Sequence, residues 1–169
     1  MLFWAYFLAD LNPALIPLSL YIHMPWCVRK CPYCDFNSHA VPDGKLSLAL
    51  EESYLQALVA DFKTQLDFAQ GRQIHSVFIG GGTPSLISAQ GYQWLFAKLK
   101  QLIVFEPNCE ITLEANPGTL EHDPFIGYLQ AGINRLSIGV QSFNSAHLQK
   151  LGRIHSNEDA LNAIQLAQE

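Results

Sequence analysis

Basic residues are scarce in this sequence. Lys and Arg together number 10 among 169 residues, against 15 Asp and Glu, and the formal net charge is -5. Neither Lys nor Arg forms a block, and neither occurs before Arg29. The chain therefore lacks the electrostatic means to hold a phosphate backbone, and we expect no nucleic-acid partner.

The sequence also lacks a stretch that would cross a membrane or direct secretion. Residues 1–9 are apolar, but Asp10 and Pro13 interrupt the run and no basic residue flanks it. A membrane span needs about 20 apolar residues, and a signal peptide needs a basic start. We expect no transmembrane segment, and we interpret residues 1–16 as an N-terminal extension to a domain at 17–169.

Cysteine is limited to four residues, and three of them, Cys27, Cys31 and Cys34, fall within eight positions. Without a signal peptide, this clustering does not suit the disulfide framework of a secreted domain. A reducing, cytoplasmic location fits it better. Cys109 stands apart at the start of a predicted strand, and we interpret it as a core residue.

The rest of the composition, 49% hydrophobic and 15% charged, is sufficient for one globular core. Short apolar runs with strand character are each followed by a stretch with helical spacing. The predicted strands are Leu18–Ile22, Ser76–Ile79, Ile111–Ala115 and Arg135–Val140. The predicted helices cover 55–66 with a stop at Gly71, 89–103 with Ser88 as N-cap, Asp123-Pro124 to Gly132, and the sequence after Phe143. This alternation predicts an α/β fold, in which a parallel sheet is covered by helices.

Chemically distinctive residues follow the predicted strands. The cysteines come after the first strand, Gly80-Gly81-Gly82-Thr83 after the second, Glu114 near the end of the third and Gln141 after the fourth. In parallel α/β folds the loops after the carboxyl ends of the strands build the site. The sequence therefore predicts that these residues meet at one edge.

Three thiolates in one short loop suit a cubane iron-sulfur cluster with one iron left open. A structural zinc site is one alternative, but it needs a fourth ligand, and His23 and His39 have no partner at finger spacing. A dithiol oxidoreductase is another, because Cys31-Pro32-Tyr33-Cys34 is a C-x-x-C motif. That class of enzyme does not need Cys27 or a triglycine loop.

Residues outside the cysteine loop give weaker signals. The glycine loop lacks both P-loop and G-x-G-x-x-G spacing, but its backbone groups could pair with the carboxylate and ammonium of an amino acid. Glu114 and Gln141 suit either a solvated rim or a site. Arg153 by itself suggests a solvated surface charge. Each His taken singly suggests a solvated or core residue, so we assign no axial heme ligand.

The spacing Cys27-x-x-x-Cys31-x-x-Cys34, with Tyr33 and the glycine loop, resembles the radical SAM superfamily. Further motifs resemble the group that contains oxygen-independent coproporphyrinogen III oxidase and the heme chaperone HemW. They are Tyr21 to Cys27, Gly80 to Ser85, Glu114 to Thr119 and Arg135 to Phe143. The resemblance covers Leu18 to about Ser156. It implies a partial (β/α) barrel with about four of six strand-helix units, truncated at the C-terminus.

The resemblance also implies cofactors and the residues that hold them. Cys27, Cys31 and Cys34 would ligate a 4Fe-4S cluster, and Tyr21, Gly81 and Glu114 would contact S-adenosylmethionine on its open iron. The oxidase binds a second S-adenosylmethionine. The positions that match its contacts are Tyr33, Gly82, Thr83, Gln141 and Arg153.

One departure decides between the two members of this group. The oxidase has a further cysteine two residues after the third ligand, whereas this sequence has Phe36, and Cys34 to His39 resembles HemW. We therefore expect a HemW-like heme chaperone, with the oxidase as the alternative and a glutaredoxin-like protein as a remote one. The expected partners are heme or porphyrin, heme-acceptor proteins, and an electron donor such as a flavodoxin or ferredoxin.

Overall fold

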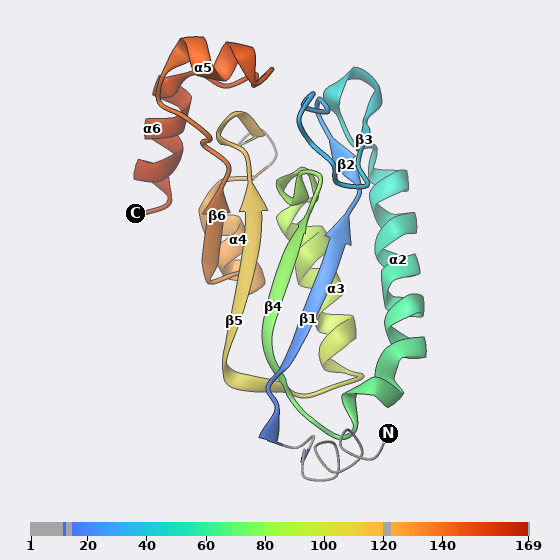
Figure 1. The fold of residues 1–169 in the computed structure, drawn as a ribbon. Coiled ribbons are helices and arrows are strands. Elements are labelled where there is room, and N and C mark those ends of the chain that lie inside the picture. Colours follow the sequence, from blue (N-terminus) through green and yellow to red (C-terminus); the bar gives the residue numbers. More distant parts are fainter. Residues whose placement is uncertain (1–11, 13–14, 120–122, 169) are drawn as a thin grey trace, which may run out of the picture.

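The computed structural model describes residue 12 and residues 15–119 and 123–168 (Figure 1). Most of the expected N-terminal extension, 1–11 and 13–14, lies outside these residues. Within the described part, parallel strands form one four-stranded sheet in the order β1-β4-β5-β6. The strands are β1 (Leu18–Met24), β4 (Ile74–Gly81), β5 (Phe105–Ala115) and β6 (Arg135–Ile138).

Helices follow each strand of the sheet, as the alternating pattern predicts. They are α2 (Leu48–Gln65), α3 (Ala89–Lys100), α4 (Phe125–Ala131), α5 (Ser145–Lys150) and α6 (Asn157–Leu166). Short 3-10 turns lie at η2 (Pro42–Gly44), η3 (Leu66–Ala69), η4 (Pro84–Leu86) and η5 (Pro117–Thr119). The prediction of a partial barrel with four strand-helix units is confirmed.

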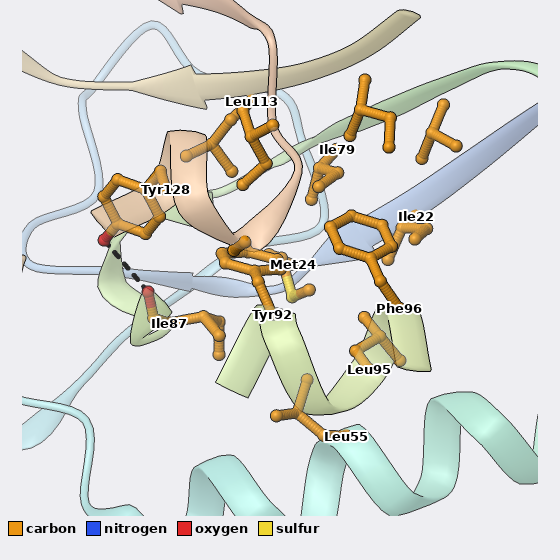
Figure 2. Packing of buried hydrophobic residues seen from close by; sticks show 14 of the residues in the cluster. Ile22, Met24, Leu55, Ile79, Ile87, Tyr92, Leu95, Phe96, Leu113 and Tyr128 are labelled. Carbon is orange, nitrogen blue, oxygen red and sulfur yellow. Dashed lines mark hydrogen bonds between the residues drawn. The ribbon is translucent and has the colours of Figure 1, made fainter. Parts of the chain in front are cut away.

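The core lies between the sheet and helices α2, α3 and α4. Ile79 of β4 and Leu113 of β5 are fully buried and face Tyr92 and Leu95 of α3, while Leu55 of α2 packs from the outer side (Figure 2). Burying a side chain of this size contributes about 1.5–3 kcal/mol. This packing holds the strands in parallel, so their carboxyl ends emerge at one edge (Figure 1).

Local capping signals set the helix ends. The Ser88 side chain accepts a hydrogen bond from the N–H of Gly91 at 2.9 Å, which confirms the predicted N-cap of α3. Gly132 ends α4 with φ of 104°, as predicted. Gly71 is not the end of α2, because that helix already ends at Gln65 and continues as the 3-10 turn η3.

Several predicted boundaries are wrong. β5 begins six residues earlier than expected, so Cys109 lies within the strand and not at its start, although it is buried as predicted. β6 stops at Ile138, two residues short of the predicted end at Val140. The helical sequence after Phe143 is divided into α5 and α6 by a turn that contains Gly152 at φ of 67°.

Candidate functional site

A small pair of parallel strands closes the cysteine loop, and the sequence did not predict it. β2 (Trp26–Cys27) pairs with β3 (His39–Ala40). The N–H of His39 donates to the carbonyl of Pro25 at 2.7 Å. The pairing fixes both ends of the loop beside the carboxyl end of β1, where the upper part of Figure 1 shows it.

Inside this loop the three cysteines remain free thiols. Cys27 is buried at the end of β2, while Cys31 and Cys34 are partly exposed. The N–H of Cys34 donates to the carbonyl of Cys31 at 3.1 Å, which makes a tight turn between them. The ammonium of Lys30 donates to the carbonyl of Phe36 at 3.1 Å and so ties the loop across its width.

All three cysteines line one cavity of about 400 Å³ at the carboxyl edge of the sheet. Among the described residues, no three Cys, His, Asp or Glu side chains converge on a point that would hold a single metal ion. A cubane cluster makes a different demand, because each thiolate binds a different iron and the sulfur atoms stay apart. Soft thiolates around an open cavity therefore fit such a cluster better than they fit one zinc ion.

The cavity also gathers most of the other residues that the sequence singled out. They are Tyr33, Gly81, Gly82, Thr83, Glu114, Gln141 and Arg153. Tyr21 is the exception, since it lines a separate cavity along the edge strand β1. The sequence did not select Asn116, which also lines the cysteine cavity, although it lies directly after β5 in the quoted motif Glu114 to Thr119.

The glycine loop packs closely on the chain that leads into the cysteine loop. The N–H of Gly82 donates to the carbonyl of Met24, and the N–H of Thr83 to the carbonyl of Trp26, each at 2.6 Å. A Cβ on Gly82 would collide with the Trp26 carbonyl. The N–H of Gly81 also has an acceptor, because it donates to Oε2 of Glu114. The N–H groups of Gly81, Gly82 and Thr83 are therefore not open to a ligand, contrary to that part of the expectation, whereas the part that concerns the carbonyls stays a prediction. Glycine at position 82 allows the close approach of two loops.

Glu114 and Tyr21 lie on the face of the sheet away from the helices. Glu114 is half-buried, and its Oε2 accepts the N–H of Gly81 at 3.2 Å. Burial raises the pKa of this carboxyl, and the Gly81 N–H opposes the change. The Tyr21 hydroxyl lies 3.0 Å from Nδ1 of His23, and its ring stacks on Phe78 at 6.3 Å between centroids. Burial, together with the charge of Glu114, raises the pKa of Tyr21.

Arg153 is not the solvated surface charge that its position in the sequence suggested. Its side chain is partly buried and reaches across the cavity to the cysteine loop, where Nη1 lies 3.4 Å from the Cys31 sulfur. Gln141, in contrast, is exposed and takes a left-handed backbone with φ of 64°, which is uncommon for a residue other than glycine. Both residues lie at the cavity, as the resemblance implied.

The ring nitrogens of His23, His75 and His155 contact other groups of the protein. His23 uses both, with Nε2 2.8 Å from the carbonyl of Asn37 and Nδ1 against Tyr21. Nε2 of His155 lies 3.0 Å from the carbonyl of Val140, and burial lowers the pKa of this buried imidazole. His122 lies outside the described residues.

The family model of the radical SAM superfamily matches residues 21–169, and the chain belongs to that superfamily. The chain is 55% identical over 159 residues to the heme chaperone HemW of Haemophilus influenzae, a match that covers 92% of this chain and 40% of the relative. It is 51% identical over 153 residues to the heme chaperone HemW of Escherichia coli, covering 90% and 39%. The chain thus spans about two fifths of the length of these curated relatives.

A solved structure supports the same fold. The coproporphyrinogen III oxidase HemN from Escherichia coli, described as a radical SAM enzyme, superimposes with a TM-score of 0.78 at 27% identity. The match covers 98% of this chain and 37% of that one. In the part of the chain that the structure describes, no helix is long and apolar enough to span a membrane.

Proposed function

We propose that this chain is the cluster-binding part of a HemW-like heme chaperone. In this proposal, residues 17–169 form a radical SAM core that holds a 4Fe-4S cluster and S-adenosylmethionine in a reducing, cytoplasmic location. The complete protein would bind heme and pass it to acceptor proteins. An electron donor such as a flavodoxin or ferredoxin would reduce the cluster.

One observation carries the proposal. Three free cysteines at the superfamily's spacing line a single cavity with the glycine loop and Glu114, in a chain that is 55% identical to a heme chaperone. A dithiol enzyme would need only Cys31 and Cys34, yet buried Cys27 lines the same cavity. This arrangement favours a three-thiolate cluster over disulfide exchange.

The protein's residues would divide the work at the bound cofactors. Cys27, Cys31 and Cys34 would hold the cluster, which when bound supplies an electron for cleavage of the sulfonium of S-adenosylmethionine. Glu114 is suited to an ammonium group, because it is a half-buried carboxylate that already accepts one N–H. Gly81 and Tyr21 complete the first set of proposed contacts. Tyr33, Gly82, Thr83, Gln141 and Arg153 would form a second set.

Anaerobic reconstitution with iron and sulfide tests the proposal directly. We expect about four irons per chain and a paramagnetic resonance signal of the reduced cluster that changes when S-adenosylmethionine is added. Cys27→Ala should abolish iron loading. Cys109→Ala is the matched control. Cys109 is 8% exposed and Cys27 is 7% exposed, but Cys109 lies outside the cavity. Full iron loading of Cys27→Ala would refute a three-cysteine site and favour a dithiol oxidoreductase.

Oxygen-independent coproporphyrinogen III oxidase is the second candidate, because the solved oxidase shares the fold at a TM-score of 0.78. The exposed Phe36 argues against it, since the oxidase has a cysteine there. The test requires a full-length form, the cluster, a reductant and S-adenosylmethionine. Decarboxylation of coproporphyrinogen would overturn the chaperone proposal, whereas heme binding without decarboxylation would support it.

A further inference from the structure

The guanidinium of Arg153 joins three loops at the carboxyl edge of the sheet. On the cysteine loop, Nη1 donates to the sulfur of Cys31 at 3.4 Å and to the hydroxyl of Tyr33 at 3.5 Å. After β5, Nη2 donates to Oδ1 of Asn116. After β6, the same nitrogen donates to the carbonyl of Gly139 at 2.9 Å.

These contacts use all the outward-facing donors of the side chain. A guanidinium has five N–H groups, four of them on Nη1 and Nη2. The four hydrogen bonds above match those four, and the remaining donor, Nε, is buried with no partner among the described residues. Both terminal nitrogens of Arg153 are therefore engaged in joining the three loops.

The residues on both sides of Arg153 reinforce the same junction. Gly152 comes so close to the cysteine loop that a Cβ on it would lie 2.8 Å from Cδ of Pro32, and its φ of 67° also favours glycine. On the other side, buried His155 contacts the carbonyl of Val140 at 3.0 Å. The segment 152–155 thus touches the cysteine loop at one end and the chain after β6 at the other.

We infer that Arg153 is a positioning residue that clamps the cysteine loop to the loops after β5 and β6. The planar guanidinium suits this role, because it presents donors in several directions from one rigid group. A lysine ammonium has the same charge but cannot span the three loops. The clamp does not rest on the proposed function.

Hydrogen exchange of the cofactor-free chain, followed by mass spectrometry of its peptides, tests the clamp. In Arg153→Ala we expect faster exchange in three separate segments, residues 28–38, 116–118 and 139–142. The expected increase is about tenfold, which is what the loss of one charge-assisted hydrogen bond in the closed state allows. Peptides of β4 should exchange as in the wild type, which shows that the variant is folded.

Two further variants separate the clamp from simpler explanations. Arg135→Ala removes an exposed arginine paired with Glu110 at 2.9 Å and should leave the three segments unchanged. Arg153→Lys keeps the charge and covers the case in which the alanine variant does not fold, and we expect it to exchange like Arg153→Ala. Wild-type exchange in Arg153→Lys, or changes confined to residues 150–156 in both variants, would overturn the inference.

Discussion

Alanine at position 81 tests how the glycine loop is held against β1. Gly81 has φ of 111°, and an added Cβ would lie 2.6 Å from Cε1 of His23 and 2.9 Å from the carbonyl oxygen of Met24. A left-handed backbone costs an L-residue about 1–2 kcal/mol. The imidazole must also move and lose its contact with Tyr21 or Asn37, which costs about 0.5–1.5 kcal/mol. Gly81→Ala should therefore lower the free energy of unfolding by about 1.5–3.5 kcal/mol.

Urea unfolding followed by circular dichroism measures this difference, and Gly132→Ala is the matched control. Gly132 has a similar φ of 104°, but a Cβ there would meet no atom of the described residues within 4 Å. The control should lose only the backbone part, about 1–2 kcal/mol. Equal losses in the two variants would refute the argument that the contact with His23 and Met24 requires glycine at position 81.

Two further substitutions probe the site and the core. Because the folded pKa of Glu114 is raised, its contribution to stability is fully present below the unfolded pKa and is lost as pH rises through the folded value. Glu114→Gln should therefore gain stability relative to the wild type as pH rises from about 4 to 7. Urea midpoints at both pH values check this, and a variant midpoint that falls relative to the wild-type midpoint contradicts it. The one O–H of buried Tyr128 is shared between the carbonyls of Ser85 at 2.8 Å and Ile87 at 3.0 Å. Tyr128→Phe should cost about 1–3 kcal/mol in thermal or urea unfolding, and a loss under about 0.5 kcal/mol would show that these bonds are not needed.

The parts of the fold that sequence predicts well are those set by local chemistry. Ser88 caps α3 because its hydroxyl reaches an N–H three residues away, and Gly132 ends α4 because it adopts a left-handed backbone. The apolar runs of the strands gave the parallel sheet and the edge at which the cysteines gather. Strand ends were less predictable: β5 extends back through Phe105 because it pairs with Ile74, a contact between distant residues.

The candidate site was predictable in membership but not in contacts. The position of Cys27, Cys31 and Cys34 after the first strand predicted that they lie at this edge of the sheet, and they line the cavity there, whereas Tyr21 lines a different one. The bonds of Arg153 join residues up to 122 positions apart, and no local pattern encodes such a contact. The hydrogen bonds of the N–H groups of Gly82 and Thr83 could not be predicted for the same reason, since their acceptors lie far away in the sequence.

The order of the strands explains why the site needs a clamp. β1 and β6 lie at opposite ends of the sheet, and three strand spacings separate them by roughly 14 Å. The cysteine loop follows β1, and Gly139 and Gln141 follow β6, so sheet pairing alone does not bring these loops together. Among the described strands, β6 has a neighbour on one side only, and exposed Leu129 borders a cavity of about 800 Å³ beside it. β1 is also an edge strand, but it pairs with β4 over seven residues, whereas β6 pairs with β5 over four. The edge that carries Gln141 is therefore the less supported of the two, and the side chain of Arg153 supplies a direct link from it to the cysteines.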